Sequence, residues 1–228
     1  HVEIARLLLE AGGATGQAVE CVRLLLEAGA ATDQADVEGC TPLFMACQNN
    51  HPEIARLLLA TDADINQAMN DGTTPLYIAS QNGHLECAQL LRDAGADINQ
   101  ADEEGTTPLS IACYMGHVEI ARLLVEASAA ANQADDTGAT PLYIVCQKGH
   151  LEIVQLLLEA GGATGQADED GCTPLFKACQ NNHPEIARLL LATDADINQA
   201  MNDGTTPLFV ACERGQLECA QLLLEAGA

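Results

Sequence analysis

The sequence predicts an all-α solenoid of stacked helix-turn-helix repeats whose tips are β-turns or hairpins. Neither helix of such a repeat could bury its apolar face alone, whereas stacked repeats share one continuous core. With 3 Phe, 3 Tyr and no Trp, the chain has few of the large aromatic side chains that fill globular cores. The tripeptide Thr-Pro-Leu recurs at intervals of 33 residues, beginning at Thr41, Thr74, Thr107, Thr140, Thr173 and Thr206.

Each Thr-Pro-Leu is expected to start the first helix of a repeat. The Thr side chain caps the helix, and Pro stands at the first helical position, where its missing N–H costs nothing. A loop with Asn or Gly then leads to a His, as in QNGHLE and QKGHLE. The pattern therefore predicts both ends of the first helix.

The second helix has the pattern EIARLLLEA or EIVQLLLEA. Its early Glu suits the helix dipole, and Gly29, Gly95 and Gly161 are expected to end it in the left-handed conformation. Asp62 and Asp194 replace this Gly at a cost of about 1 kcal/mol each, so we expect these two helix ends to fray first. Segments such as NQAMNDG and NQADDTG then form the turns at the tips.

The repeats are predicted to form a single domain over residues 1–228. Two partial repeats at 1–18 and 19–35 come first, and the others follow at about 36–68, 69–101, 102–134, 135–167, 168–200 and 201–228. At the junction of Ala18 and Val19 the pattern lacks the turn, first helix and loop of one repeat. A deletion would leave Leu residues of a second helix exposed, so we favour a segment between these two residues that the sequence omits. Both ends also look cut, because Leu222, Leu223 and Leu224 would need a further repeat to cover them.

Together these residues form the pattern D-x-x-G-x-T-P-L-x-x-A-C-x-x-G-H-x-E-I-x-x-L-L-L-x-x-G-A-D-I-N, which resembles the ankyrin repeat. The six Thr-Pro-Leu anchors extend the resemblance over essentially the whole chain. The chain departs from the family where the usual His follows Thr-Pro-Leu. There it has Phe44, Tyr77, Ser110, Tyr143, Phe176 and Phe209. Aromatic rings at this position could point either into the core or into the concave groove that the family uses to bind partners.

The formal net charge of −24, from 33 acidic and 9 basic residues, limits the class of partner. Phosphate backbones and anionic lipid surfaces demand Lys and Arg, so we predict neither a nucleic-acid nor a membrane partner. A basic segment of another protein, steered in by the negative field, is the expected partner.

The cysteines indicate the compartment. Five of the ten recur at steps of 33 residues or multiples of it, at Cys47, Cys113, Cys146, Cys179 and Cys212. Equivalent positions of stacked helices lie about 8 to 10 Å apart, and a disulfide needs Cα atoms within about 7 Å. The ladder is therefore predicted to hold small buried thiols in a reducing compartment, which favours a cytoplasmic protein.

No constellation typical of an enzyme or of a metal site stands out. The recurrent histidines, His51, His84, His117, His150 and His183, are about 10 Å apart and cannot share a metal at roughly 2.0 Å per Zn–N bond. The resemblance implies instead that this His fixes the loop by hydrogen bonding. DADIN lacks the Gly and Glu of a calcium loop, and GGATG lacks the spacing of a phosphate loop. We predict no catalytic residue, metal or cofactor.

The resemblance implies that the tips and the exposed side of the first helices line a concave groove for partners. The residues mapped to it are Glu38, Asp71, Glu103, Glu104, Tyr114, Met115, Asp136, Glu169, Asp170 and Asp203. This row is mostly acidic, with apolar contact at Tyr114 and Met115, and it favours a basic protein partner. The alternative is a solvated acidic face that keeps the array soluble. Lys177 stands where the other repeats have apolar residues and either reaches the rim or contacts the partner.

Two functional classes remain open. The first is a non-enzymatic scaffold or adaptor that binds a basic protein segment in the groove. The second is an architectural or self-assembling repeat array. A further alternative is that the chain is the interaction part of a larger protein with a separate effector domain. The stretch from Ala46 to Leu76 recurs unchanged from Ala178 to Leu208, which indicates duplication of a block that displays one surface twice.

Overall fold

The computed structural model describes residues 16–193 and 195–228, and this part of the chain is helical without strands. Its helices are α2 (Gly16–Glu27), α3 (Pro42–Gln48), α4 (Pro52–Leu59), α5 (Pro75–Asn82), α6 (Leu85–Asp93), α7 (Pro108–Met115), α8 (Val118–Glu126), α9 (Pro141–Lys148), α10 (Leu151–Glu159), α11 (Pro174–Gln180), α12 (Pro184–Ala192), α13 (Pro207–Glu213) and α14 (Leu217–Glu225).

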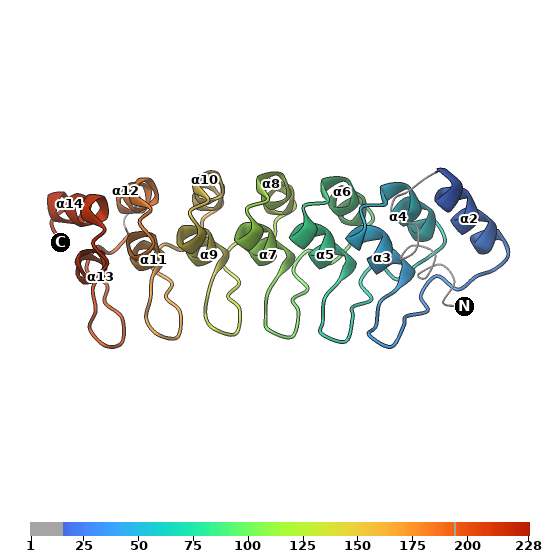
Figure 1. The fold of residues 1–228 in the computed structure, drawn as a ribbon, viewed down its shortest axis with the longest axis horizontal. Coiled ribbons are helices and arrows are strands. Elements are labelled where there is room, and N and C mark those ends of the chain that lie inside the picture. Colours follow the sequence, from blue (N-terminus) through green and yellow to red (C-terminus); the bar gives the residue numbers. More distant parts are fainter. Residues whose placement is uncertain (1–15, 194) are drawn as a thin grey trace. The chain divides into compact units, whose positions relative to one another are not determined.

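The chain divides into two compact units at Ile111 and Ala112, within α7. In the N-terminal unit, α3 packs on α5 and α4 on α6, while α3 also pairs with α4 and α5 with α6. In the C-terminal unit, α9, α11 and α13 form one layer, and α8, α10, α12 and α14 form the other. Figure 1 shows that the long loops project from the layer of first helices within each unit. The predicted stacked helix-turn-helix fold is confirmed.

The six Thr-Pro-Leu sequences start the first helices as predicted. Each Thr Oγ1 accepts a hydrogen bond from the backbone N–H three residues later, at 3.1 to 3.2 Å. The aromatic residues that follow lie mainly in the core, because Phe44 and Phe176 are 2% exposed and Tyr77 and Tyr143 are 8% and 7% exposed. Phe209 differs and is 58% exposed.

The cysteine ladder is only partly buried. All ten cysteines are free, and Cys212, predicted to be buried, is exposed. Burial raises the pKa of Cys113 well above its usual value. Contacts also join Cys47 to Cys87 and Cys179 to Cys219, and hydrogen bonding within each pair, together with burial, raises the pKa of the first thiol.

At the N-terminal junction, Ala18 and Val19 are consecutive residues of helix α2. A segment omitted between them stays a prediction. Leu24 on the same helix is 57% exposed, as expected for a second helix without its own first helix. Near the other end, Leu222 and Leu223 are buried and only Leu224, at 59%, is exposed.

Left-handed backbone conformations mark the ends of the second helices. Asp62 has φ +60°, as its place in the repeat predicts, and Asp194 lies outside the described residues. Sequence reasoning missed Ser128, which follows α8 with φ +66° where Gly95 and Gly161 have φ +89° and +83°. An L-residue other than Asn or Asp adopts this conformation at a cost of roughly 1 to 2 kcal/mol.

Replacing Ser128 with Gly is therefore expected to stabilise the protein. The relief of strain exceeds the extra chain entropy of Gly in the unfolded state, and we expect a gain of about 0.5 kcal/mol. Urea unfolding followed by circular dichroism measures it. Ala127→Gly is the matched control, because Ala127 has φ −80° and Gly there should destabilise. A loss of stability in Ser128→Gly would contradict the strain.

Candidate functional site

The tips of neighbouring repeats are joined by backbone hydrogen bonds. In the N-terminal unit, the Asn70 N–H donates to the Glu38 carbonyl at 3.1 Å, and the Glu103 N–H to the Asp71 carbonyl at 2.9 Å. In the C-terminal unit, the Asn202 N–H donates to the Asp170 carbonyl at 2.9 Å. These bonds hold the acidic side chains of successive tips in a fixed register within each unit.

Carboxylates also stabilise the turns at the tips. Asp102 Oδ1 accepts from the N–H groups of Glu104 and Thr106 at 3.0 and 2.8 Å. Asp71 Oδ1 accepts from the Thr73 N–H at 2.9 Å. Hydrogen bonds from the Thr73 side chain and then from its backbone lower the pKa of Asp71, so this carboxylate is ionised at neutral pH.

Gly72 allows these tips to approach each other. Its φ is +84°, and a Cβ at this position would lie 2.9 Å from both the Asp102 Cα and the Glu103 N. Because these neighbours are backbone atoms, they cannot move aside without breaking the bond between the two tips. Gly is therefore required here for the register of Asp71 and Glu103.

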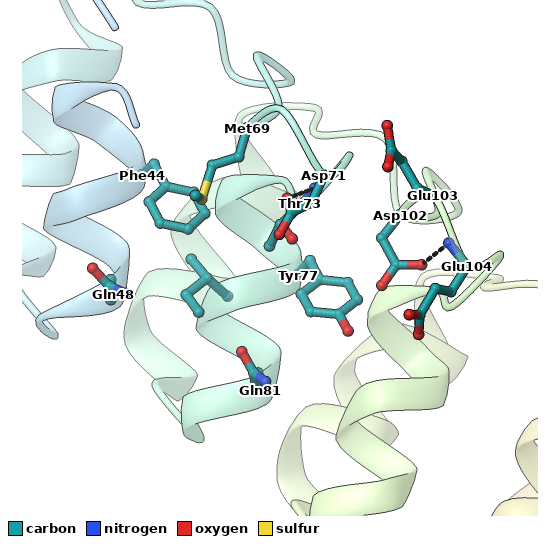
Figure 2. Close-up of a pocket in the computed structure, with 11 residues that line it drawn as sticks. Phe44, Gln48, Met69, Asp71, Thr73, Tyr77, Gln81, Asp102, Glu103 and Glu104 are labelled. Atoms are coloured by element: carbon teal, nitrogen blue, oxygen red, sulfur yellow. Dashed lines mark hydrogen bonds between the residues drawn. The ribbon is translucent and has the colours of Figure 1, made fainter. Parts of the chain in front are cut away.

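A pocket of about 430 Å³ lies between the tips and the first helices of the N-terminal unit. Its lining comes from three successive repeats and consists of Phe44, Gln48, Met69, Asp71, Thr73, Tyr77, Ile78, Gln81, Asp102, Glu103 and Glu104. Figure 2 shows Phe44 and Tyr77 on either side, Gln48 and Gln81 along the helices, and the carboxylates on the tip loops. The pocket thus combines an apolar floor with four carboxylates.

Tyr77 connects the floor to the acidic wall. Burial raises the pKa of the Tyr77 hydroxyl well above its usual value, and the charge of Asp102 and a hydrogen bond with it raise it further. The hydroxyl therefore stays protonated and donates to a carboxylate. The same arrangement recurs in the C-terminal unit, where the Tyr143 hydroxyl donates to Asp168 Oδ2 at 2.6 Å.

The Lys and Arg side chains described among residues 16–111 do not line this pocket. They are Arg23 on α2, Arg56 on α4 and Arg92 on α6. They pair with Glu20, Glu86 and Asp93 at 3.7, 3.8 and 2.7 Å. The lining of the pocket contains no basic residue, so its four carboxylates have no basic side chain among them.

The C-terminal unit places lysines on the equivalent face. Lys148 Nζ lies 3.7 Å from the centroid of the Tyr114 ring. Lys177 Nζ lies 5.5 Å from the Tyr143 ring and 5.9 Å from the Phe176 ring, and it donates to Gln180 Oε1 at 3.3 Å. Cations over aromatic faces at these distances are attracted by the ring quadrupole.

The residues predicted to bind a partner are all exposed, and three of them share the pocket. Asp71, Glu103 and Glu104 line it, whereas Glu38, Asp136, Glu169, Asp170 and Asp203 lie on other tips. Tyr114 and Met115 are 45% and 42% exposed on α7. Sequence reasoning missed Met69 and Asp102 as lining residues. Their position at the start of the tip segment, one repeat apart, was the available signal.

Two of the recurrent histidines, His84 and His183, hold loops in place, as the resemblance to the family implied. His84 Nδ1 lies 2.9 Å from the Cys47 carbonyl oxygen of the preceding repeat, and His183 Nε2 lies 3.3 Å from that of Gln147. Within the described residues, no group of three His, Cys, Asp or Glu side chains is arranged to hold a metal ion. No helix among residues 16–193 and 195–228 has both the length and the apolar composition needed to cross a membrane.

Comparison with known proteins agrees with this architecture. The family model described as "Ankyrin repeats (3 copies)" matches residues 8–102, 94–164 and 161–228. A search of curated proteins gave no match.

Proposed function

The chain belongs to the ankyrin repeat family, whose repeats generally mediate protein–protein interactions, and on this premise we propose that it is a non-enzymatic scaffold that binds a basic protein segment. The segment lies along the tips and the exposed side of the first helices. The observation that carries this proposal is the pocket in the N-terminal unit, where four carboxylates surround an apolar floor without a basic residue. Opposite charge on a partner would supply both attraction and orientation.

The charge of the whole molecule supports the same class of partner. A net charge of −24 attracts basic segments over distances of about one Debye length, roughly 8 Å at physiological salt. If the net charge alone caused binding, a basic peptide would bind equally well at any acidic part of the surface. Binding at a specific site should instead be weakened more by charge changes at the tips than by equal changes elsewhere.

The test compares two variants with the same change of net charge. The tip variant carries Glu103→Lys, Glu104→Lys, Glu169→Lys and Asp170→Lys. The helix variant carries Glu27→Lys, Glu126→Lys, Glu159→Lys and Glu225→Lys, at the exposed last residues of α2, α8, α10 and α14, where Lys suits the helix dipole. Binding of lysine-rich, neutral and glutamate-rich peptides of equal length is measured by fluorescence anisotropy.

We expect the parent and the helix variant to bind the lysine-rich peptide and the tip variant to bind at least about tenfold more weakly. Equal weakening in both variants would overturn the proposal, because net charge alone would then explain binding. Absence of peptide binding by the parent would also overturn it. Concentration-dependent oligomers that persist in the tip variant, measured by sedimentation, would favour the assembly alternative, which the exposed Phe209, Leu217 and Leu224 support.

A further inference from the structure

Lys177 on α11 places a cation beside two aromatic rings. It stands at a position where the other repeats carry Met45, Ile78, Ile111, Ile144 and Val210. Its ammonium group lies close to the rings of Tyr143 and Phe176 and donates to Gln180. These three residues are the counterparts, three repeats later, of Phe44, Tyr77 and Gln81.

Those counterparts are lining residues of the pocket in the N-terminal unit. In the C-terminal unit the chain thus places its own ammonium group where, in the N-terminal unit, the pocket is open. The ammonium group is absent from the N-terminal pocket because Ile78 stands where the later repeat has Lys177. An isoleucine side chain contributes to the floor but supplies no charge.

The charges around the two positions also differ. The N-terminal pocket is lined by Asp71, Asp102, Glu103 and Glu104. The residues three repeats later are Asp170, Met201, Asn202 and Asp203, which include only two carboxylates. The open pocket therefore has more negative charge than the position that already holds a lysine. Among residues 16–111 the arginines Arg23, Arg56 and Arg92 form ion pairs with other carboxylates.

We propose that the pocket lined by Phe44, Tyr77 and the four carboxylates binds a lysine side chain of the partner. This inference rests on the proposed function and identifies the partner side chain that enters the pocket. The methylene groups of the lysine lie against Phe44, Met69 and Ile78, and the ammonium group meets the ring of Tyr77 and the carboxylates of the tips. An aliphatic stem with a terminal cation matches an apolar floor with an acidic rim.

The test fills the pocket with a lysine from the chain itself. Ile78→Lys reproduces the arrangement of Lys177, so its ammonium group should occupy the site. Ile144→Lys is the matched control, because Ile144 holds the equivalent position two repeats later and both isoleucines are 7% exposed. Both variants add one charge. The probes are acetyl-Gly-Lys-Gly-amide and the same peptide with norleucine, titrated by NMR.

We expect the lysine peptide, and not the norleucine peptide, to shift the signals of Tyr77 and Ile78 in the parent. Ile78→Lys should weaken binding by about tenfold or more, and Ile144→Lys should change it by less than about twofold. Should Ile78→Lys fail to fold by circular dichroism, the double variant Glu103→Gln and Glu104→Gln replaces it, with the same expected loss.

Two results would overturn this assignment. The first is equal binding of the lysine and norleucine peptides, and the second is unchanged binding in both Ile78→Lys and the Gln double variant. If the longer lysine-rich peptide still binds the parent and is lost in the tip variant, the proposed function stands and only the lysine pocket falls. If the longer peptide does not bind the parent either, both fall.

Discussion

Gly149→Ala is expected to destabilise the protein by about 2 to 3 kcal/mol, two to three times the cost of Gly161→Ala. Gly149 caps α9 with φ +87°, and a Cβ there would lie 2.5 Å from His183 Cε1 and 2.9 Å from both ring nitrogens. The left-handed conformation alone costs an Ala roughly 1 kcal/mol. Displacing the imidazole also weakens its hydrogen bond with the Gln147 carbonyl and disturbs the packing, at about 1 to 2 kcal/mol.

Gly161→Ala is the matched control for the backbone term. Gly161 follows α10 with φ +83°, and a Cβ there would have no atom within 4 Å. We therefore expect only the backbone cost, about 1 kcal/mol. Equilibrium unfolding in urea measures both variants. In a His183→Ala background the excess cost of Gly149→Ala should largely vanish, and a cost that persists there would show that the imidazole is not its cause.

The features that the sequence predicts well are those with local causes. In each Thr-Pro-Leu the Thr caps the helix and the Pro takes the first helical position. This tripeptide therefore predicts the start of six helices. The replacement of a Gly of the repeat by Asp62 predicts a left-handed residue, and its φ is +60°. Ser128 also replaces this Gly, so alignment of the repeats alone is enough to predict its positive φ.

The pocket could not be predicted in the same way, because it depends on contacts between repeats. Phe44, Tyr77 and Glu103 come from three successive repeats, and the sequence alone left open whether such rings face the core or the groove. The contact between Cys47 and Cys87 was missed for a related reason. Their separation is not a multiple of 33, so comparing equivalent positions did not bring them together.

Leu190→Ala is expected to lower the free energy of unfolding by about 2 to 5 kcal/mol, the range typical of a buried leucine. Leu190 lies on α12, is 0% exposed and belongs to the layer formed with α10 and α14. Its removal loses the transfer free energy of the side chain and leaves a cavity, because neighbouring helices relax only partly. Leu58 holds the same place in the identical stretch and is also 0% exposed, so Leu58→Ala should cost a similar amount.

Leu189→Ala is the control that separates the effect of side-chain burial on stability from the effect of helix propensity. Leu189 precedes Leu190 on the same helix and is only half-buried, so the same substitution should cost about 1 kcal/mol. Since each repeat is stabilised chiefly by its neighbours, the loss in Leu190→Ala should spread locally. Hydrogen exchange should show weaker protection of amides in α12, α10 and α14 than in the parent. Equal costs of the two substitutions in urea unfolding would contradict this account, because the two leucines are adjacent on one helix and differ in depth of burial.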